Sequence, residues 1–483
     1  MKRFGRRLLR WVDDRIGLTD KLRPLLEHKV PPETGWAYVF GSATLAAFLL
    51  QVVTGVALAT IYVPSAAGAY QSLQFITHRA LLGHLLRGLH YFGASAMIVL
   101  LGLHAIRVFI TGSYKFPREV NWISGVVLLG LTVTMGFTGQ VLRWDQDGVW
   151  SAVVAAEQAG RVPFLGHALA DFILAGRHIG TATLSHMFTY HVFLIPSLIA
   201  LAIGIHVYLV VHHGISEPPV AGEPVERSTY RERYRRLLEA RGVPFFPDAA
   251  WRDAAFVLVV VLVVLALAVF VGPKALTRPP DPAIIQARPR PDWYLLWYFA
   301  VLAMLPHGTE KYLLWILPLL AGLVLFGLPL VFGEGERHPR RRPWAWTSVA
   351  LIVIGVGVFW RMGARAPWSP DFSAPPLPDS VVASSDSVVV YGAHLFHVRA
   401  CENCHRISGY GGTRGPDLTH IGDRLPPAQI RQWIENGGHN MPAFSHVLDS
   451  EQIEALQAFL STRTRPGSPG LTDSSRGYGG SGS

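Results

Sequence analysis

Long runs of apolar residues alternate with short polar segments along most of this chain. Seven of these runs approach or reach the roughly 20 residues that a membrane-spanning helix needs. They cover residues 36–63, 85–110, 122–142, 186–211, 253–272, 313–333 and 345–361. Beyond residue 385 the pattern changes to short amphipathic stretches, which predict a small helical domain exposed to water. The expected fold class is all-α, a polytopic membrane helical bundle followed by a small globular domain.

Changes in composition divide the chain further. In chain order the expected parts are a basic amphipathic surface segment (1–35), the first four spans (36–215), the last three spans (216–361), a Pro/Ser-rich linker (362–385), a compact polar domain (386–463) and a Gly/Ser-rich tail (464–483). The first segment has no continuous apolar stretch, so it is expected to lie on the membrane surface. The tail has the composition of a disordered segment.

Composition and charge support a membrane protein. Half of the residues are hydrophobic and only 16% are charged, which is unusual for a soluble globular protein. The net charge of +10 is concentrated in short segments between apolar runs, where it sets membrane orientation, so no nucleic-acid partner is expected. The most basic segments share one side of a seven-span arrangement. That side is predicted to be cytoplasmic, which delivers the chain beyond residue 362 to the outer face.

The two cysteines of the chain stand in the motif Cys401-Glu402-Asn403-Cys404-His405. Two thiols at this spacing can add to haem vinyl groups, and the adjacent imidazole can ligate the iron. A thioredoxin-like redox motif is the rival interpretation, but it requires a βαβ context, whereas this segment reads as helix, loop and helix. With no other cysteine, an iron–sulfur cluster held by four cysteines would have to belong to another chain.

Four histidines inside predicted spans form a second pattern. His90 and His104 are 14 residues apart on the second span, which places them on one helix face about 21 Å apart. His191 and His206 are 15 residues apart on the fourth span, about 60° from perfect alignment at 3.6 residues per turn. Histidines within a membrane are costly and often functional. Two facing helices could therefore hold two bis-histidine haems, one above the other.

Small residues recur at the same interval on the first and third spans. These glycines form two pairs, each 14 residues apart: Gly41 with Gly55, and Gly125 with Gly139. Glycine is common where spanning helices pack closely, but two pairs at the histidine interval indicate room for two haems. Arg87 and Arg107 lie three residues before His90 and three after His104, where they could meet haem propionates. Arginines near helix ends can also extend simply to the membrane surface.

These motifs resemble known families. Residues 1–360, and above all HLLRGLHYFGASAMIVLLGLHAIRVFITGSYKFPREVNW and TYHVFLIPSLIALAIGIH, resemble cytochrome b of the cytochrome bc family. The 15-residue interval, Pro196 and Gly214-Ile215-Ser216 resemble the photosynthetic bf branch and its bacterial relatives. That branch is split into two chains, whereas this one is continuous. It also attaches an extra haem to a first-helix cysteine, and the matching position here is Val39, so that covalent haem is not expected.

The C-terminal segment resembles the small class of cytochrome c domains. Besides the cysteine motif it contains Gly415-Pro416-Asp417-Leu418 and Met441-Pro442-Ala443-Phe444. The resemblance implies that His405 and Met441 ligate the iron of a covalent haem c, and that Pro416 packs on the haem. The other histidines of the domain are expected at its surface: His394, His397, His420 and His439.

The loop before the sixth span contains Pro291-Asp292-Trp293-Tyr294, similar to the PEWY motif that lines the outer quinol-oxidation site of the cytochrome bc family. Asp292 replaces the usual Glu and is one methylene shorter, so it is expected to take up the quinol proton through water. Residues 144–150 resemble the segment that forms the other wall of that site. The Asp variant favours menaquinone as the substrate.

The resemblance implies a subunit of a quinol–cytochrome c reductase, a translocase. Quinol would be oxidised at an outer site, with electrons carried across the membrane by two non-covalent b haems and outward by the haem c, coupled to proton translocation. The implied partners are a Rieske iron–sulfur protein, a soluble or membrane-bound cytochrome c or terminal oxidase, the quinone pool, membrane lipid and a second copy of the complex as a homodimer. The implied location is the bacterial inner membrane, with a cytoplasmic N-terminus and a periplasmic cytochrome c domain. Two alternatives are a di-haem b-type membrane anchor of another quinone-linked dehydrogenase and a transporter with incidental histidines.

Overall fold

The structure is a computed structural model. It describes residues 11–17, 23, 27–176, 179–280, 290–304, 310–365, 374–412, 415–437, 441, 443–445 and 447–473. About half of the expected surface segment 1–35, part of the linker 362–385 and the end of the tail 464–483 lie outside these residues. The chain divides into two units, which are described separately below. The helical architecture confirms the all-α fold class expected from the sequence.

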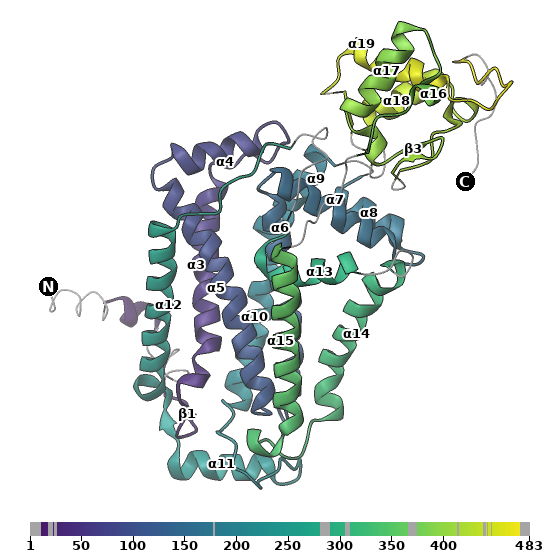
Figure 1. Ribbon diagram of the computed structural model, residues 1–483. Helices are drawn as coiled ribbons and strands as arrows, with labels where there is room; N and C mark the ends of the chain where they lie inside the picture. The colour runs from purple at the N-terminus through teal and green to yellow at the C-terminus, as the bar shows by residue number, and fades with distance from the viewer. Residues whose placement is uncertain are drawn as a thin grey trace. The chain divides into compact units, whose positions relative to one another are not determined.

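The first unit is a bundle of long helices (Figure 1). Its elements in chain order are α3 (Phe40–Ala59), α4 (Ala69–His78), α5 (Gly83–Ile110), α6 (Glu119–Val141), α10 (Ile195–His213), α11 (Tyr230–Arg241), α12 (Ala250–Phe270) and most of α14 (Glu310–Val331) and α15 (Pro343–Arg365). α3 packs along α5, α6 packs along α10, and α12 packs against α5 and α3. The connecting helices α4 and α11 lie at opposite ends of the bundle, and β1 (Lys29–Val30) pairs antiparallel with β2 (Val243–Pro244).

Six helices among the described residues are long and apolar enough to cross a membrane. They are Phe40–Ala59, Gly83–Ile110, Glu119–Val141, Thr181–His213, Phe245–Phe270 and Pro343–Arg365, and each overlaps a predicted span. The predicted span at 313–333 falls on α14. Its apolar stretch, Trp315–Val331, is shorter than the six spans above. Many large apolar side chains on these helices face outward, as lipid-facing residues do. The protein is therefore a multi-pass membrane protein, and the count of seven spans stays a prediction.

A small apolar core lies in the middle of the first unit. Its buried members come from α3, α5 and α10: Ala43, Ala47, Phe48, Met97, Leu100, Ile195 and Ile199. In sequence these residues fall between the members of the glycine and histidine pairs on the same helices. The core therefore separates two levels of the bundle, and the pairs lie one member at each level.

The second unit contains two groups of elements. The first has α7 (Gln146–Gly160) packed on α8 (Gly166–Leu174), together with the 3-10 turn η4 (Trp293–Leu295) and α13 (Leu296–Met304). Asp145 caps α7, because its carboxylate accepts a hydrogen bond from the Gly148 N–H at 3.0 Å. These elements carry the residues that were predicted to form the quinol site.

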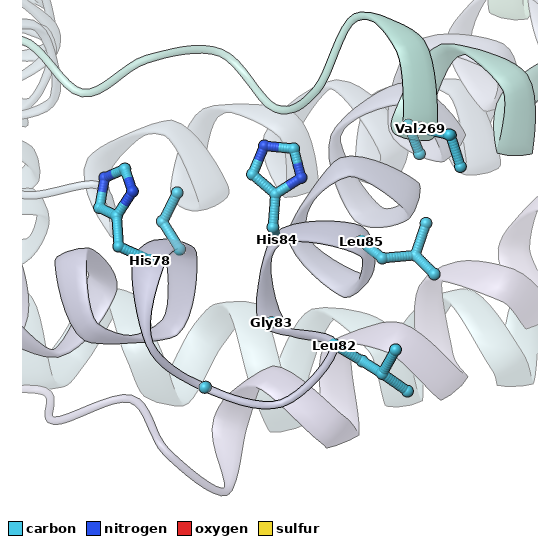
Figure 2. A pocket seen from close by; sticks show the side chains of 9 residues that line it. His78, Leu82, Gly83, His84, Leu85 and Val269 are labelled. Atoms are coloured by element: carbon cyan, nitrogen blue, oxygen red, sulfur yellow. The ribbon is translucent and has the colours of Figure 1, made fainter.

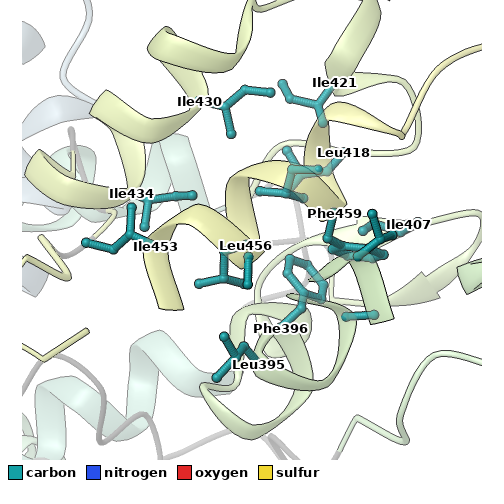
Figure 3. Close-up of a cluster of buried hydrophobic side chains, with 14 of the residues drawn as sticks. Leu395, Phe396, Ile407, Leu418, Ile421, Ile430, Ile434, Ile453, Leu456 and Phe459 are labelled. Carbon is teal, nitrogen blue, oxygen red and sulfur yellow. The ribbon is translucent and has the colours of Figure 1, made fainter. Parts of the chain in front are cut away.

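The second group is the C-terminal domain, which is built from short helices around its own core. Its main helices are α17 (Ser387–Val398), α18 (Pro427–Asn436) and α19 (Ser450–Ser461), with η6 (Cys401–Asn403) and a small hairpin of β3 (Arg406–Ile407) and β4 (Tyr410–Gly411). α17 and α19 cross in close contact, and the rings of Phe396 and Phe459 lie 5.7 Å apart. Figure 3 shows these two rings within the buried cluster. A capping box formed by Asp449 and Gln452 starts α19.

Candidate functional site

The four predicted histidines face each other in two pairs across the first unit. The ring centres of His90 and His191 lie 6.2 Å apart, and those of His104 and His206 lie 6.4 Å apart. A metal bonds an imidazole nitrogen at about 2 Å, so two imidazoles on opposite sides of one metal have ring centres about 6 Å apart. Both gaps therefore fit one iron between two imidazoles. The structure brings together all four residues that the sequence analysis selected.

Three of these rings are held by hydroxyl groups that the sequence analysis did not identify. The Nδ1 atoms of His90, His191 and His206 lie 2.9, 3.0 and 2.8 Å from the hydroxyl oxygens of Thr54, Thr138 and Ser124, respectively. A metal-bound imidazole usually has a hydrogen bond at its other nitrogen, which fixes its orientation. With Nδ1 occupied, Nε2 is the nitrogen left for iron. A signal was present in the sequence, because each hydroxyl residue directly precedes one of the paired glycines.

Each paired glycine lies against one histidine. A Cβ atom at Gly41 would lie 3.2 Å from Cε1 of His104, and one at Gly55 would lie 3.2 Å from Cε1 of His90. At Gly139 and Gly125 the distances to the nearest histidine carbon would be 2.7 and 3.6 Å. Side chains at the first three positions would crowd the rings. The glycines thus leave space at both levels of the bundle, as the 14-residue interval predicted.

A π-helical turn explains the 15-residue interval on the fourth span. Residues Tyr190–Leu194 form this turn between α9 (Thr181–Thr189) and α10, and the Ile195 N–H bonds to the Tyr190 carbonyl five residues earlier. Pro196 has no N–H to continue the ordinary ladder. A π turn takes up one extra residue, so His191 and His206 align as residues 14 apart would. The predicted 60° misalignment is therefore wrong, because it assumed a regular helix.

The two arginines that flank the second span differ in their contacts. Arg87 is buried and donates to the Thr77 hydroxyl at 2.9 Å and to the Lys274 carbonyl at 2.7 Å. Arg107 stacks on Tyr38, with its guanidinium carbon 3.6 Å from the ring centre. Its Nε and Nη2 atoms are buried without a hydrogen-bond partner among the described residues. Buried donors of this kind need an acceptor, and a haem propionate fits the donors of Arg107.

The C-terminal domain positions its cysteine motif between α17 and the small hairpin. The His405 Nδ1 lies 2.9 Å from the Pro416 carbonyl, so this ring too is oriented through one nitrogen. A Cβ at Gly415 would lie 2.6 Å from the same ring. Cys401 and Met441 both pack against the hydrophobic core of the domain, and Pro442 lies outside the described residues. The surroundings of His405 fit a haem ligand.

The local structure disfavours the thioredoxin-like interpretation of the cysteine motif, because η6 lies between α17 and a short antiparallel hairpin and not in a βαβ unit. Burial also raises the pKa of the Cys401 thiol, the opposite of the shift in redox cysteines. Glu402 is buried and pairs with His397, which is therefore not a simple surface residue as predicted. His394 is exposed, as expected. His420 is half-buried, and its Nδ1 atom is fully buried. The fourth of these histidines, His439, lies outside the described residues.

The predicted quinol-site motif begins a helical turn in the second unit. Asp292 immediately precedes η4, and the rings of Trp293 and Tyr294 meet edge to face at 5.8 Å. Pro291 is buried directly before them. Residues 145–147 on α7 contact the segment around Thr277 and the backbone of Arg290. One of the two predicted walls thus contacts Arg290, the residue directly before the motif of the other wall.

A separate pocket of about 360 Å³ lies at the ends of α4, α5 and α12. Its lining includes His78, Leu82, Gly83, His84, Leu85 and Val269, and Figure 2 shows both imidazoles as sticks. None of the predicted site residues lines it.

The bundle with its opposed histidine pairs and the appended domain with its haem-attachment motif define a class of protein, the membrane-bound cytochromes. Comparisons with known proteins agree. The family model "Cytochrome b/b6/petB" matches residues 25–214, "Cytochrome b(C-terminal)/b6/petD" matches 279–373, and "Cytochrome C oxidase, cbb3-type, subunit III" matches 390–460. The chain belongs to the cytochrome b/b6 family, with a cytochrome c domain at its C-terminal end.

Individual relatives show how far the likeness extends. Cytochrome b6 of Synechococcus elongatus is 36% identical over 208 residues, which are 43% of this chain and 97% of that protein. Cytochrome b6 of Mastigocladus laminosus gives the same identity and coverage. A solved structure described as "Hyperthermophilic respiratory Complex III" superimposes with a TM-score of 0.64 at 25% identity, covering 81% of this chain and 95% of that one. Membership implies b haems in the bundle, a haem c in the C-terminal domain, and electron transfer as one subunit of a bc-type complex.

Proposed function

We propose that this chain is the cytochrome b and c subunit of a quinol:cytochrome c oxidoreductase. The observation that carries the proposal is the presence of two opposed histidine pairs at two levels of one bundle, each with the spacing of a single iron. Two b haems are proposed, with His90 and His191 as ligands of one and His104 and His206 as ligands of the other. In the C-terminal domain the proposed iron ligands are His405 and Met441, and the proposed attachment points are Cys401 and Cys404.

When bound, these haems supply one-electron carriers at two depths of the membrane and in the fused domain. The chain's own residues hold and orient them. Thr54 and Ser124 fix imidazole rings through Nδ1, which leaves Nε2 toward the iron. The four paired glycines leave room for flat groups beside the rings, and Arg107 offers two buried donors to a propionate. Pro416 orients the His405 ring through its carbonyl oxygen.

The proposed quinol site is the segment Pro291–Tyr294 together with the start of α7. Oxidation of a quinol releases two electrons and two protons, so a base near the hydroxyl groups accelerates the reaction. Asp292 is the proposed acceptor of one proton, at its carboxylate. Trp293 and Tyr294 form an aromatic surface beside it, and their edge-to-face contact keeps both rings in place. Pro291 fixes the backbone that leads into this turn.

Further parts of the proposal follow from the same reaction. The partners are a Rieske iron–sulfur protein as acceptor of one electron and a cytochrome c or terminal oxidase that the fused domain reduces. The complex is proposed to be a homodimer in a bacterial inner membrane, with the N-terminus in the cytoplasm and residues 386–463 outside. Protons released outside and taken up inside would make the reaction a proton translocation.

The test uses the purified complex with its Rieske partner, menadiol as donor and cytochrome c as acceptor. Asp292→Asn keeps the shape of the side chain but cannot take up a proton, so it should slow quinol oxidation by about 100-fold or more. Asp292→Glu restores the residue usual in the motif and should remain active. All haem bands should be unchanged in both variants.

Two outcomes would contradict the proposal. A wild-type rate for Asp292→Asn at saturating menadiol would remove Asp292 as the proton acceptor. Absence of menadiol oxidation by the wild-type complex, despite b-type and c-type bands in its reduced spectrum, would remove the quinol-oxidising function and favour a membrane anchor of another dehydrogenase.

A further inference from the structure

The start of α7 is fastened to the beginning of the loop that precedes the motif Pro291–Tyr294. Asp145 accepts a hydrogen bond from the backbone N–H of Thr277 at 3.0 Å, and the Gln146 N–H donates to the carbonyl of Arg278 at 3.1 Å. Asp145 is fully buried. This end of the loop is therefore fixed by backbone groups, which a substitution in the loop itself would not remove.

The same turn of α7 also contacts the end of that loop. The Asp147 carboxylate accepts from the backbone N–H of Arg290 at 3.4 Å, directly before Pro291. The Arg290 guanidinium donates in turn to the Ala364 carbonyl at 3.0 Å. One short stretch, Asp145–Asp147, thus contacts residues 277–278 and 290.

Arg143 joins the two carboxylates. Its Nη2 atom pairs with Asp145 and lies 3.7 Å from the Asp147 carboxylate, and all three side chains are buried, with 12%, 0% and 11% of their surfaces exposed. Two buried carboxylates repel each other unless a cation lies between them. Trp144, which lies between Arg143 and Asp145 in sequence, has a φ of 44°, a left-handed conformation that only a well-determined environment holds. The arrangement is therefore a rigid network.

The network also has open donors. The Nε and Nη1 atoms of Arg143 are buried and find no hydrogen-bond partner in the part of the chain that the structure describes. Buried donors without an acceptor are costly, which is expected where a ligand or an ordered water supplies the acceptor. A network that only stabilised the fold would be expected to satisfy its own donors.

We propose that Asp147, held in place by Arg143, is a positioning residue that fixes the segment Pro291–Tyr294 against α7 for quinol binding. The inference rests on the proposed function, because it assigns a role within that quinol site. Asp147 acts on the motif through the backbone of Arg290 and is not proposed to exchange a proton with the substrate. A displacement of about 1 Å in a substrate-positioning group can cost about 100-fold in rate.

The experiment compares Asp147→Ala and Asp147→Asn in the full complex, with menadiol as donor and rates normalised to b haem content. Asp147→Ala removes the acceptor of the Arg290 N–H and should lower kcat/KM by about 100-fold. Asp147→Asn keeps an oxygen acceptor at the same place and loses only the ion pair, so it should lose less than about tenfold, mainly through KM. Haem bands and their midpoint potentials should stay as in the wild type, since no haem ligand changes.

Ser151→Ala is the matched control. Its hydroxyl donates to the Asp147 carbonyl at 2.6 Å, so the substitution perturbs the same helical turn without removing the carboxylate. Its kcat/KM should equal the wild-type value.

Wild-type kcat/KM in an Asp147→Ala complex with full haem content would overturn the proposal, and so would equal losses in the Ala and Asn variants. If Asp147→Ala does not accumulate, Asp147→Leu decides, because it also lacks an acceptor for the Arg290 N–H while filling more of the space, and a wild-type kcat/KM in that variant contradicts the positioning role. Failure of the proposed function is distinguished by the wild-type complex itself, which would then not oxidise menadiol.

Discussion

The two histidine pairs lie at two levels of the same bundle, and their rings have different hydrogen-bond partners. In the His90–His191 pair, the Nδ1 atom of each ring shares a hydrogen bond with a threonine hydroxyl. The Nδ1 atom of His191 also lies 3.1 Å from the Met135 carbonyl oxygen. In the His104–His206 pair, among the described residues, only His206 has such a hydroxyl partner, Ser124. The first pair is therefore held mainly by hydrogen bonds from neighbouring helices.

The second pair has more space beside one of its rings, His206, and lies close to an arginine with unpaired donors. A Cβ at Gly125 would lie 3.6 Å from His206, whereas the closest approach in the first pair, at Gly139, is 2.7 Å. Arg107, three residues from His104, keeps two buried donors without a partner among the described residues. The first site is thus held by hydrogen bonds to both rings, with closer packing at Gly139, whereas the second leaves two arginine donors for its ligand to satisfy.

The largest expected effect comes from removing a proposed haem ligand at the second pair, His206. His206→Ala should abolish the haem between His104 and His206 and retain the one between His90 and His191, because an apolar core separates the two levels. Reduced-minus-oxidised spectra should show about half of the b-type absorbance, since one of two proposed haems remains. Loss of all b-type absorbance at a normal protein level would show that the two sites are not independent.

An alanine should be harmful at Gly139, beside His191, and mild at Gly125, beside His206. Gly139→Ala forces a methyl group within 2.7 Å of His191 and should lower the free energy of unfolding by about 1–3 kcal/mol, with loss of b haem. Gly125→Ala meets His206 at 3.6 Å, an ordinary contact, and should resemble the wild type. Thermal unfolding and haem content measured on both variants test the contrast, which equal effects would contradict.

The smallest expected effect concerns the hydroxyl partners. Thr54→Val removes the hydroxyl partner of His90 at nearly constant volume and should weaken haem retention about tenfold. Thr138→Val should have less effect, because the Met135 carbonyl remains next to the same atom of His191. The rate of haem transfer to excess apomyoglobin measures both variants. Faster haem transfer from Thr138→Val than from Thr54→Val would show that the Met135 carbonyl does not replace the Thr138 hydroxyl as the partner of His191.

The histidine and glycine positions could be predicted because they repeat at helical intervals, and such intervals depend only on local geometry. The hydroxyl partners could not, since a threonine before a glycine has many possible roles until neighbouring helices are placed. Arg87 and Arg107 are placed symmetrically about the two histidines in the sequence. In the structure, however, the guanidinium of Arg87 already donates hydrogen bonds to Thr77 and Lys274. That difference depends on a loop far away in sequence.

Loop regions were predicted less completely than helices. The motif around Asp292 was recognised from its residues, but its connection to α7 through Asp147 and Arg290 depends on tertiary contacts that have no sequence period. In the C-terminal domain the partnership of His397 with Glu402 was missed for a similar reason. A charged residue between two cysteines is expected at the surface, and only the packing of the domain buries it.

The π turn at Tyr190–Leu194 makes the fourth span tolerant of a change in length. In a regular helix the deletion of one residue rotates everything after it by about 100°, which would turn a ligand away from its partner. Here the deletion of one residue together with replacement of Pro196 can be absorbed, because the turn reverts to ordinary α-helix and His206 keeps its direction. Chains whose two histidines are 14 or 15 positions apart can therefore build the same site, and the interval alone does not distinguish their architectures.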